Sequence, residues 1–410
     1  MMNHILLNGH GINVRVQDAK LIIKDGFYSL DEEPKDYIFN PKRIDVDSII
    51  VYGQDGEVSI DAVRWLIKHN VQITFLDWNG KLLTTMLPPE SVQVDTKFKQ
   101  YETYNNFDRR LKLARSFIVG KFARTQEVLD YLKERYSEVD NDFEREKKEL
   151  TFTKSLIDIL QVEGRVASFY WKQLRKVIPK EYGFDSREFV KRPWGAGDQI
   201  NCLLNYGYAI LESECLRVIN SVGLDAHIGF LHEKCMGKNS LAYDMQEPFR
   251  FVIDLAIIDA IENDIFEKKD FIRTETYTLK LRPSGAKKFI ERIDAWLNYD
   301  TQKTLSRLIP SDASSDVKSR LSIRSLMLLK ARELVKAIKK DGIPDFSEPQ
   351  ITLRRLDTQK VRDQILAIPY SKAKKLGFSK GTLYYMKQNA KADKPFKIYD
   401  SVKKKLDALS

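Results

Sequence analysis

The 410-residue chain contains only three cysteines, Cys202, Cys215 and Cys235, and no Cys-x-x-Cys pair. This scarcity argues against a disulfide framework, and we expect buried free thiols in a reducing cytoplasm. No apolar run approaches the roughly 18 residues of a membrane-spanning helix, so we expect no membrane association. The first residues, MMNHILLNGHG, lack a basic stretch followed by a long apolar segment, so they do not predict a signal peptide.

Acidic residues are scarce at one end of the chain. The last 60 residues contain 15 Lys and Arg, five Asp and no Glu, an excess of +10 that equals the net charge of the whole chain. Apolar positions at helical spacing continue through this tail, so a disordered solubility tail is less favoured. The tail therefore predicts nucleic-acid binding.

Length and changes of pattern predict an α+β multidomain protein with three parts. Residues 1–92 alternate short apolar runs, among them INVRVQ, KLIIK, DSIIVYG and VQITFLD, and are expected to form a small β-rich domain. Turn-forming dipeptides lie between the runs, at Asp25-Gly26, Asp55-Gly56 and Asn79-Gly80. Residues 59–69 have helical spacing, with Ser59 or Asp61 as the candidate N-cap.

Residues 93–345 are expected to form a large, almost entirely helical domain that carries the chemistry. Long amphipathic patterns predict helices within residues 111–136, 154–178, 200–224, 249–266 and 285–299. The charged run at 138–150 is expected to be a solvated helix or a connection between helices.

Residues 346–410 form the basic tail and contain a helix-turn-helix pattern. A short helix at 371–376 is followed by a turn at 377–379 and a second helix from Lys380 or Gly381. In such motifs the N-terminal residues of the second helix reach base edges in the major groove. The candidate DNA contacts are Lys372, Lys374, Lys375, Ser379, Lys380, Thr382, Tyr385 and Lys387. An ordinary small helical hairpin is the alternative.

The segment 223–255 carries the clearest chemical pattern. His232 ends the apolar sequence GFLH, and Asp244 and Glu247 follow three residues apart, a spacing that puts both on one face of a helix. The remaining histidines are expected to be structural: His4, His10, His69 and His227. A divalent metal would explain an imidazole and two carboxylates in an apolar segment. Asp254 would extend this site or bind a basic residue.

Glu163 lies upstream in an otherwise apolar helical run, LQVEGRVASFYW, and a buried carboxylate requires a partner. Two partners remain open: a metal shared with His232 and Glu247, or a salt bridge with a distant Arg or Lys. Oxygen ligands with one imidazole favour Mg²⁺ or Mn²⁺. Zinc, with Cys235 as a further ligand, is the less favoured alternative. Such a site polarises a phosphodiester and activates an attacking hydroxyl.

Three motifs together resemble the CRISPR-associated integrase, the catalytic subunit of the spacer-acquisition complex. They are VEGRVASFYW around Glu163, NCLLNYGYAIL at 201–211 and GLDAHIGFLHEKCMGKNSLAYDMQEPFR at 223–250. The N-terminal segment 47–83 also looks like that family's β-domain, so the resemblance spans roughly residues 1–340. It implies a β-rich dimerisation domain, a helical catalytic domain and a homodimer or higher oligomer on double-stranded DNA.

The resemblance also implies residue roles. Glu163, His232 and Glu247 match the metal ligands of the family, and Asp244 matches a further catalytic acid. Lys238 stands where the family usually has an arginine, which weakens a bidentate phosphate contact there. In KRPWGAGDQIN, Lys191 and Arg192 are candidate DNA contacts.

The basic tail departs from that integrase and resembles the casposases, transposon-borne relatives that insert their element ends into target DNA. The sequence therefore predicts a metal-dependent integrase or endonuclease, of the casposase type, that joins donor 3′-OH ends to target DNA. A CRISPR spacer integrase, which requires an adaptation partner subunit, is the first alternative. A non-catalytic DNA-binding scaffold is the second, and the intact acid–histidine set argues against it.

Overall fold

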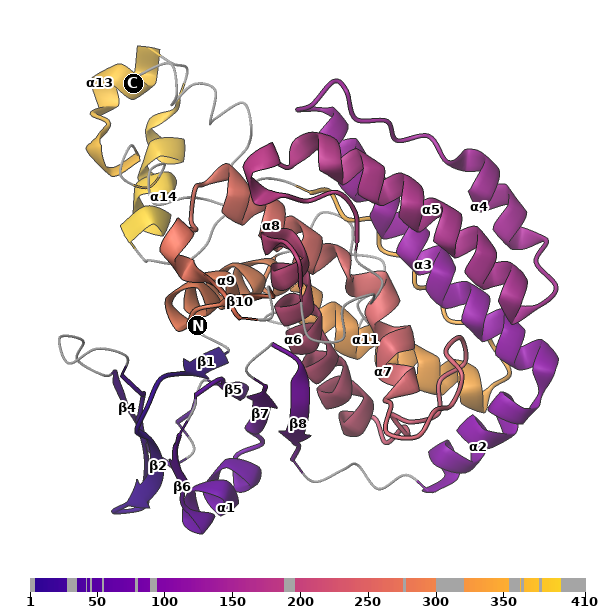
Figure 1. Cartoon of the computed structure of the whole chain (residues 1–410), viewed down its shortest axis with the longest axis horizontal. Coiled ribbons are helices and arrows are strands. Elements are labelled where there is room, and N and C mark those ends of the chain that lie inside the picture. The colour runs from indigo at the N-terminus through magenta and orange to yellow at the C-terminus, as the bar shows by residue number, and fades with distance from the viewer. Residues whose placement is uncertain are drawn as a thin grey trace.

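The computed structural model describes residues 4–27, 35–41, 43–44, 46–53, 55–77, 80–88, 94–187, 196–275, 278–299, 321–353, 362, 365–375 and 378–391. A β-rich domain lies beside a larger helical domain, and a pair of C-terminal helices lies at the upper left of Figure 1. The expected α+β architecture is confirmed. The candidate DNA contacts Lys191 and Arg192 lie outside the described residues. Within the described part of the chain, none of the helices is both long and apolar enough to cross a membrane.

Two four-stranded sheets form the β-rich domain, with strand orders β1-β5-β7-β8 and β4-β3-β2-β6. The strands are β1 (His4–Leu7), β2 (Ile12–Gln17), β3 (Lys20–Lys24), β4 (Asp36–Phe39), β5 (Ser48–Val51), β6 (Gly56–Val58), β7 (Gln72–Leu76) and β8 (Leu82–Met86). Helix α1 (Ile60–Lys68) follows β6. Ser59 is its N-cap, because the Ser59 hydroxyl accepts a hydrogen bond from the Ala62 amide at 3.1 Å.

Strands β1 and β5 of the sheet β1-β5-β7-β8 are buried on both faces. Ile5 and Ile49 belong to the core that this sheet shares with the second sheet, whereas their neighbours Leu6 and Ile50 belong to the core of the helical domain. Successive side chains of a strand point to opposite faces, so each strand contributes to both cores. This double burial explains the continuous apolar runs of β1 and β5, which pair in parallel.

The turns of this domain agree only in part with the dipeptide signals. Gly80, with φ of 80°, lies in the connection between the antiparallel strands β7 and β8. The dipeptide Asp55-Gly56 lies between β5 and β6 but forms no hairpin, because these strands belong to different sheets and β6 pairs in parallel with β2. The tight β2–β3 hairpin instead turns at Asp18 and Ala19, both with positive φ.

The helical domain contains all five expected helices. Its helices are α2 (Val94–Asn105), α3 (Phe107–Lys133), α4 (Glu144–Thr151), α5 (Leu156–Val177), α6 (Gln199–Ser221), α7 (Ser240–Gln246), α8 (Phe251–Glu262), α9 (Pro283–Leu297) and α11 (Ile323–Lys339). Short 3-10 turns are η1 (Lys180–Tyr182), η2 (Glu247–Phe249) and η3 (Lys268–Asp270). A small antiparallel pair, β9 (Phe271–Arg273) and β10 (Leu279–Leu281), was not expected in this domain.

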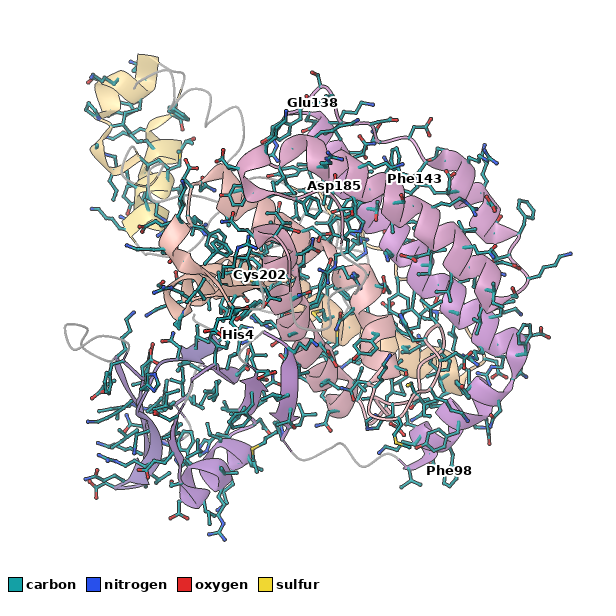
Figure 2. All side chains as sticks on the ribbon, viewed as in Figure 1. His4, Phe98, Glu138, Phe143, Asp185 and Cys202 are labelled. Carbon is teal, nitrogen blue, oxygen red and sulfur yellow. The ribbon has the colours of Figure 1, made fainter. Side chains whose placement is uncertain are left out.

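Buried polar contacts join the two domains. His4 of β1 lies at the boundary between the domains (Figure 2), where its Nε2 is 2.7 Å from Arg324 Nη2 of α11 and 3.1 Å from Asp294 Oδ1 of α9. Tyr52 donates a hydrogen bond to the Leu281 carbonyl at 3.0 Å. These contacts fix the first sheet against the helical domain.

The C-terminal pair consists of α13 (Tyr370–Lys375) and α14 (Lys380–Lys391), the two helices expected from the sequence. Apolar side chains give this pair a small core of its own: Ile365, Ile368, Ala373, Phe378, Leu383 and Ala390. The chain leading to it packs on the helical domain, since Phe346 stacks on Phe117 of α3 with ring centroids 4.5 Å apart. Ile351 is also buried in the helical core.

Candidate active site

Segments that are distant in the sequence meet at one pocket of the helical domain. The pocket has a volume of about 210 Å³, and Glu163 of α5, His232 of the α6–α7 loop and Glu247 of η2 line it together. Helix α3 completes the wall with Lys121 and Arg124. The structure therefore brings together the three residues that the sequence singled out as metal ligands. Their role as ligands stays a prediction.

Asp244 lies behind His232 and does not line this pocket. Its Oδ1 is 2.7 Å from His232 Nδ1 and accepts the His232 backbone amide at 2.9 Å. Its Oδ2 accepts the amides of Phe230 and Leu231, the latter at 3.0 Å. Asp244 is fully buried, so this carboxylate fixes both the loop and the imidazole ring. With Nδ1 occupied by Asp244, Nε2 is the ring nitrogen left for a ligand.

Glu163 and Glu247 share one cation. Lys121 Nζ forms an ion pair with Glu163 Oε1 and lies 2.7 Å from Glu247 Oε2. Burial alone would raise the pKa of Glu247, but Lys121 and Arg250 lower it to about 2, so the carboxylate stays ionised. Of the two partners left open for Glu163, the structure contains the salt bridge, and the same lysine also contacts the second acid.

A second set of buried polar groups adjoins the acids. The guanidinium of Arg250 lies 3.4 Å from Glu247 Oε1 and 4.1 Å from the ring centroid of Tyr208. Asp254 accepts hydrogen bonds from Tyr170 at 2.8 Å and from Tyr208 at 3.2 Å. Burial raises the pKa of Asp254 to about 6. Asp254 thus lines the pocket, and its hydrogen-bond donors are two tyrosine hydroxyl groups. That it extends a metal site stays a prediction.

The donor set of the pocket fits a divalent cation. The described residues contain no group of three acid, His or Cys side chains already gathered around one point, and Lys121 lies between the two glutamates. Glu247 Oε2 is buried and lies 2.7 Å from Lys121 Nζ, so a metal that took this oxygen would replace the ammonium. Two carboxylates on one cation and an imidazole oriented by a third carboxylate are ligands of the type that Mg²⁺ and Mn²⁺ take.

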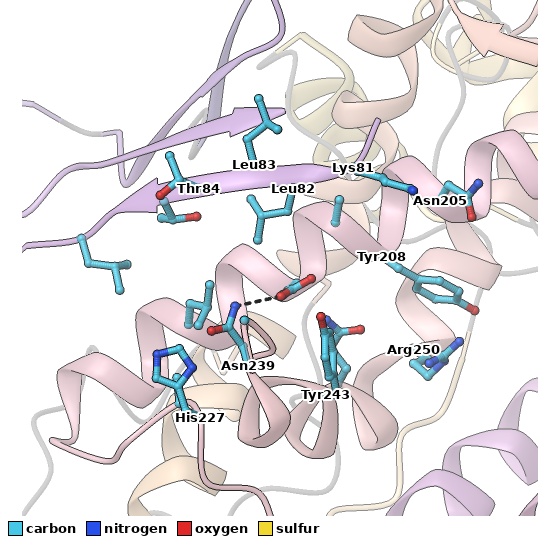
Figure 3. Close-up of a pocket in the computed structure, with 18 of the residues that line it drawn as sticks. Lys81, Leu82, Leu83, Thr84, Asn205, Tyr208, His227, Asn239, Tyr243 and Arg250 are labelled. Atoms are coloured by element: carbon cyan, nitrogen blue, oxygen red, sulfur yellow. Dashed lines mark hydrogen bonds between the residues drawn. The ribbon is translucent and has the colours of Figure 1, made fainter. Parts of the chain in front are cut away.

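A larger groove adjoins the pocket. It has a volume of about 830 Å³ and extends between β8 and α6, as Figure 3 shows with Lys81 to Thr84 on one side and Asn205 and Tyr208 on the other. Asn239 donates a hydrogen bond to Glu212 across its floor at 3.0 Å. Arg187, Tyr208 and Arg250 line both cavities, so the groove and the acid pocket meet at these side chains.

Three residues of the loop between α6 and α7, His227, Lys238 and Cys235, lie away from the acid pocket. His227 lines the groove and lies 3.2 Å from the Lys238 carbonyl oxygen, away from the acid pair. Lys238 is exposed in the same loop. Cys235 is exposed too, which corrects the expectation of three buried thiols, because the loop that carries it leaves the core after His232. Sequence reasoning missed Lys121, which stands in the apolar run FIVGKFA of α3.

The candidate DNA contacts of the tail differ in their exposure and in their hydrogen-bond partners. Ser379 caps α14 by accepting the Thr382 amide at 3.0 Å. Lys387 donates to the Leu366 carbonyl at 3.0 Å, so its ammonium is engaged inside the tail. The remaining candidates with described side chains are exposed: Lys372, Lys374, Lys380, Thr382 and Tyr385. Lys375 belongs to α13, but its side chain lies outside the described part of the structure.

Fold and pocket define an α+β protein whose helical domain carries an acid–histidine centre. The sequence model of the family "CRISPR associated protein Cas1" matches residues 5–295. The chain therefore belongs to the Cas1 family, which confirms the resemblance read from its motifs.

Individual relatives agree with this assignment. The chain is 30% identical over 277 residues to the CRISPR-associated endonuclease Cas1 1 of Archaeoglobus fulgidus, covering 63% of this chain and 77% of the relative. It is 27% identical over 301 residues to the CRISPR-associated endonuclease Cas1 1 of Francisella tularensis subsp. novicida, covering 70% and 89%.

Solved structures show the same relationship. A casposase bound to integration product has a TM-score of 0.79 and 48% identity, covering 90% of this chain and 100% of that chain. A Cas1 protein from Thermotoga maritima has a TM-score of 0.66 at 21% identity, covering 83% and 98%, which shows a shared fold.

Proposed function

We propose that this chain is a DNA integrase of the casposase type, which joins the 3′-OH end of donor DNA to a phosphodiester of target DNA by transesterification. One observation carries the proposal. Glu163 and Glu247 both contact Lys121, beside His232, whose ring Asp244 orients. This arrangement lies in a chain that is 48% identical to a casposase bound to integration product. With water in place of the 3′-OH, the same site would cleave DNA, as the name endonuclease states for its relatives.

The enzyme depends on a metal, and we propose Mg²⁺ or Mn²⁺ held by Glu163, His232 and Glu247. When bound, the cation polarises the attacked phosphodiester and lowers the pKa of the attacking hydroxyl. Asp244 holds the imidazole in the orientation and tautomer that direct Nε2 into the pocket. Lys121 and Arg250 supply positive charge that favours a phosphate beside the two carboxylates.

DNA would reach the site along the groove between β8 and α6. The groove meets the acid pocket at Arg187 and Arg250, so a phosphate backbone following it would pass two guanidinium groups. The basic tail, with the exposed N-terminal part of α14, would read the sequence of the element's own ends. Because phosphate contacts supply much of the affinity, binding should weaken steeply as salt rises.

The protein acts on DNA as an oligomer, and we propose that two copies pair through their β-rich domains. Strand β4 lies at the edge of its sheet, and Ile38 on it is 62% exposed opposite Ile22 of β3. Two active sites in one assembly would join two donor ends to the two target strands. Ile38→Asp should shift the molar mass measured by light scattering from dimer to monomer, and an unchanged mass would remove this strand from the interface.

Strand joining with the full-length protein tests the proposed function. A labelled donor duplex with a free 3′-OH is incubated with a plasmid target and Mn²⁺, beside the same donor ending in a 2′,3′-dideoxynucleotide. The first donor should become covalently linked to the plasmid, and the second should not, because it lacks the nucleophile. Equal linkage of both donors, or no linkage of either, would contradict the proposal.

A CRISPR spacer integrase is the second candidate, and the names of the curated relatives favour it. It would require an adaptation partner subunit and a leader–repeat target. The two functions separate when terminal inverted repeats and a leader–repeat duplex compete in one reaction. Preference for terminal repeats without a partner supports the casposase type, whereas joining only with a partner at a leader–repeat supports the spacer integrase.

A further inference from the structure

Lys121 of α3 lies between Glu163 and Glu247, two of the proposed metal ligands. Its Nζ forms an ion pair with Glu163 Oε1 and lies 2.7 Å from Glu247 Oε2, and the side chain is only 17% exposed. The carboxylates themselves are buried to a similar degree, with Glu163 20% and Glu247 7% exposed. One ammonium therefore bridges two acids that come from different elements of the fold.

Neighbouring cations do not replace this contact. Arg250 reaches only Glu247, on Oε1 at 3.4 Å. Arg124 lines the pocket, but its guanidinium binds Glu127 and the carbonyl of Pro349, each at 2.7 Å. Within the part of the chain that the structure describes, Lys121 is thus the cation that bridges Glu163 and Glu247.

Two poorly solvated carboxylates repel each other and require a shared positive charge. In the protein without metal, the Lys121 ammonium supplies it. A divalent cation between Glu163 Oε1 and Glu247 Oε2 would take the two oxygen atoms that the ammonium contacts, so the ammonium and the metal could not both occupy this position.

We propose that Lys121 competes with the divalent cation for Glu163 and Glu247: its ammonium bridges the two acids in the metal-free enzyme and withdraws when the metal binds. This inference rests on the proposed function, because it takes Glu163 and Glu247 as metal ligands. Lys121 then acts as a built-in counter-ion. It stabilises the empty pocket and lowers the affinity for the metal.

Lys121→Met removes the charge and keeps a side chain of similar length. The variant should bind Mn²⁺ about tenfold more tightly than the unchanged protein, because the metal no longer displaces an ion pair. Its metal-free form should melt at a lower temperature, since the two acids lose their shared cation. Its Mn²⁺-loaded form should melt close to the unchanged loaded protein. A purely structural role for Lys121 would lower both melting temperatures alike.

The experiment is a calorimetric Mn²⁺ titration of the full-length protein, Lys121→Met, Glu247→Gln and Lys112→Met, with melting curves of each. Lys112 is an exposed lysine of the same helix, so it controls for the substitution itself. If Lys121→Met does not fold without metal, Lys121→Gln, which can still donate a hydrogen bond to one glutamate, takes its place.

The outcomes distinguish the competition by Lys121 from the existence of the metal site itself. Tighter Mn²⁺ binding by Lys121→Met, with Lys112→Met unchanged and Glu247→Gln deficient, supports the competition. Equal or weaker binding by Lys121→Met, while Glu247→Gln remains deficient, overturns the role of Lys121 alone. If Glu247→Gln binds Mn²⁺ like the unchanged protein, the metal site of the proposed function is itself wrong.

Discussion

The Asp244 carboxylate fixes the orientation of the His232 imidazole, with Asp244 Oδ1 2.7 Å from His232 Nδ1. The same carboxylate accepts the backbone amides of Phe230, Leu231 and His232. The loop can therefore present the imidazole in essentially one orientation. We therefore expect Asp244 to act as a positioning residue, whereas the sequence spacing predicted that it shares a helix face with Glu247.

Asp244→Asn tests that role. The amide keeps the size of the side chain, but its nitrogen cannot accept the ring proton, so the preferred tautomer of His232 is lost. Metal affinity should fall by about 10–100-fold, the usual cost of losing a carboxylate that orients a ligand histidine. Mn²⁺ titration measures it, with exposed Asp108→Asn as the control substitution. Unchanged affinity would mean that His232 does not bind the metal through Nε2.

Two glycines in helices should respond in opposite ways to alanine. A Cβ on Gly207 of α6 would lie 2.3 Å from Ile253 Cγ2 of α8, whereas a Cβ on Gly164 of α5 meets nothing within 4 Å. Gly207→Ala should lower the free energy of unfolding by about 1–3 kcal/mol through overpacking. Gly164→Ala should raise it by about 0.5–1 kcal/mol through helix propensity. Urea denaturation measures both, and stabilisation by Gly207→Ala would contradict the close packing of α6 on α8.

The junction between the domains should weaken in acid because of His4. Burial is the largest influence and lowers the pKa of His4 below 6.5; Arg324 and Arg217 act in the same direction, and Asp294 and Glu214 oppose them. The unfolded chain therefore takes up a proton at a pH where folded His4 remains neutral. The resulting stability is present above about pH 6.5 and is lost as the pH falls toward the lower, folded value.

His4→Gln should flatten this pH dependence. Melting curves of the unchanged protein and the variant between about pH 5 and 8 measure it, with exposed His10→Gln as the control. The two proteins should differ most in slope on the acidic side. An equal decline of both melting temperatures with acid would assign the effect to other groups.

The tail should determine which DNA end is chosen. Phe346 and Ile351 are buried on the helical core, so a cut after Leu353 removes the tail and keeps this packing. The shortened protein should join donor ends at a similar rate but no longer prefer the element's own terminal sequence over a scrambled one. A competition assay with two labelled donors measures the preference. An unchanged preference would remove the tail from end recognition.

Much of the fold could be predicted because long helices and buried strands leave strong periodic patterns. The hairpin at Asp18 and Ala19 could not, since alanine rarely adopts positive φ and the dipeptide has no glycine. The parallel pairing of β6 with β2 depends on contacts distant in the sequence.

In the candidate site, too, some residues could be predicted from the sequence and others could not. Glu163 was found because a carboxylate in an apolar helix requires a partner. Lys121 was missed, because a single lysine on a long amphipathic helix is ordinary until the fold places it between two acids. Asp244 and Glu247 have different partners because α7 ends at Gln246 and Glu247 begins a 3-10 turn with Pro248.

Strand joining by His232→Ala is the sharpest test of the proposed active site. His232 is 36% exposed at its side chain and belongs to the pocket wall, so truncating it should leave the fold and duplex binding nearly intact. This variant should bind donor DNA with near-normal affinity and join no detectable ends to the plasmid. Joining at the normal rate would contradict the assignment of the Glu163, His232 and Glu247 pocket as the active site.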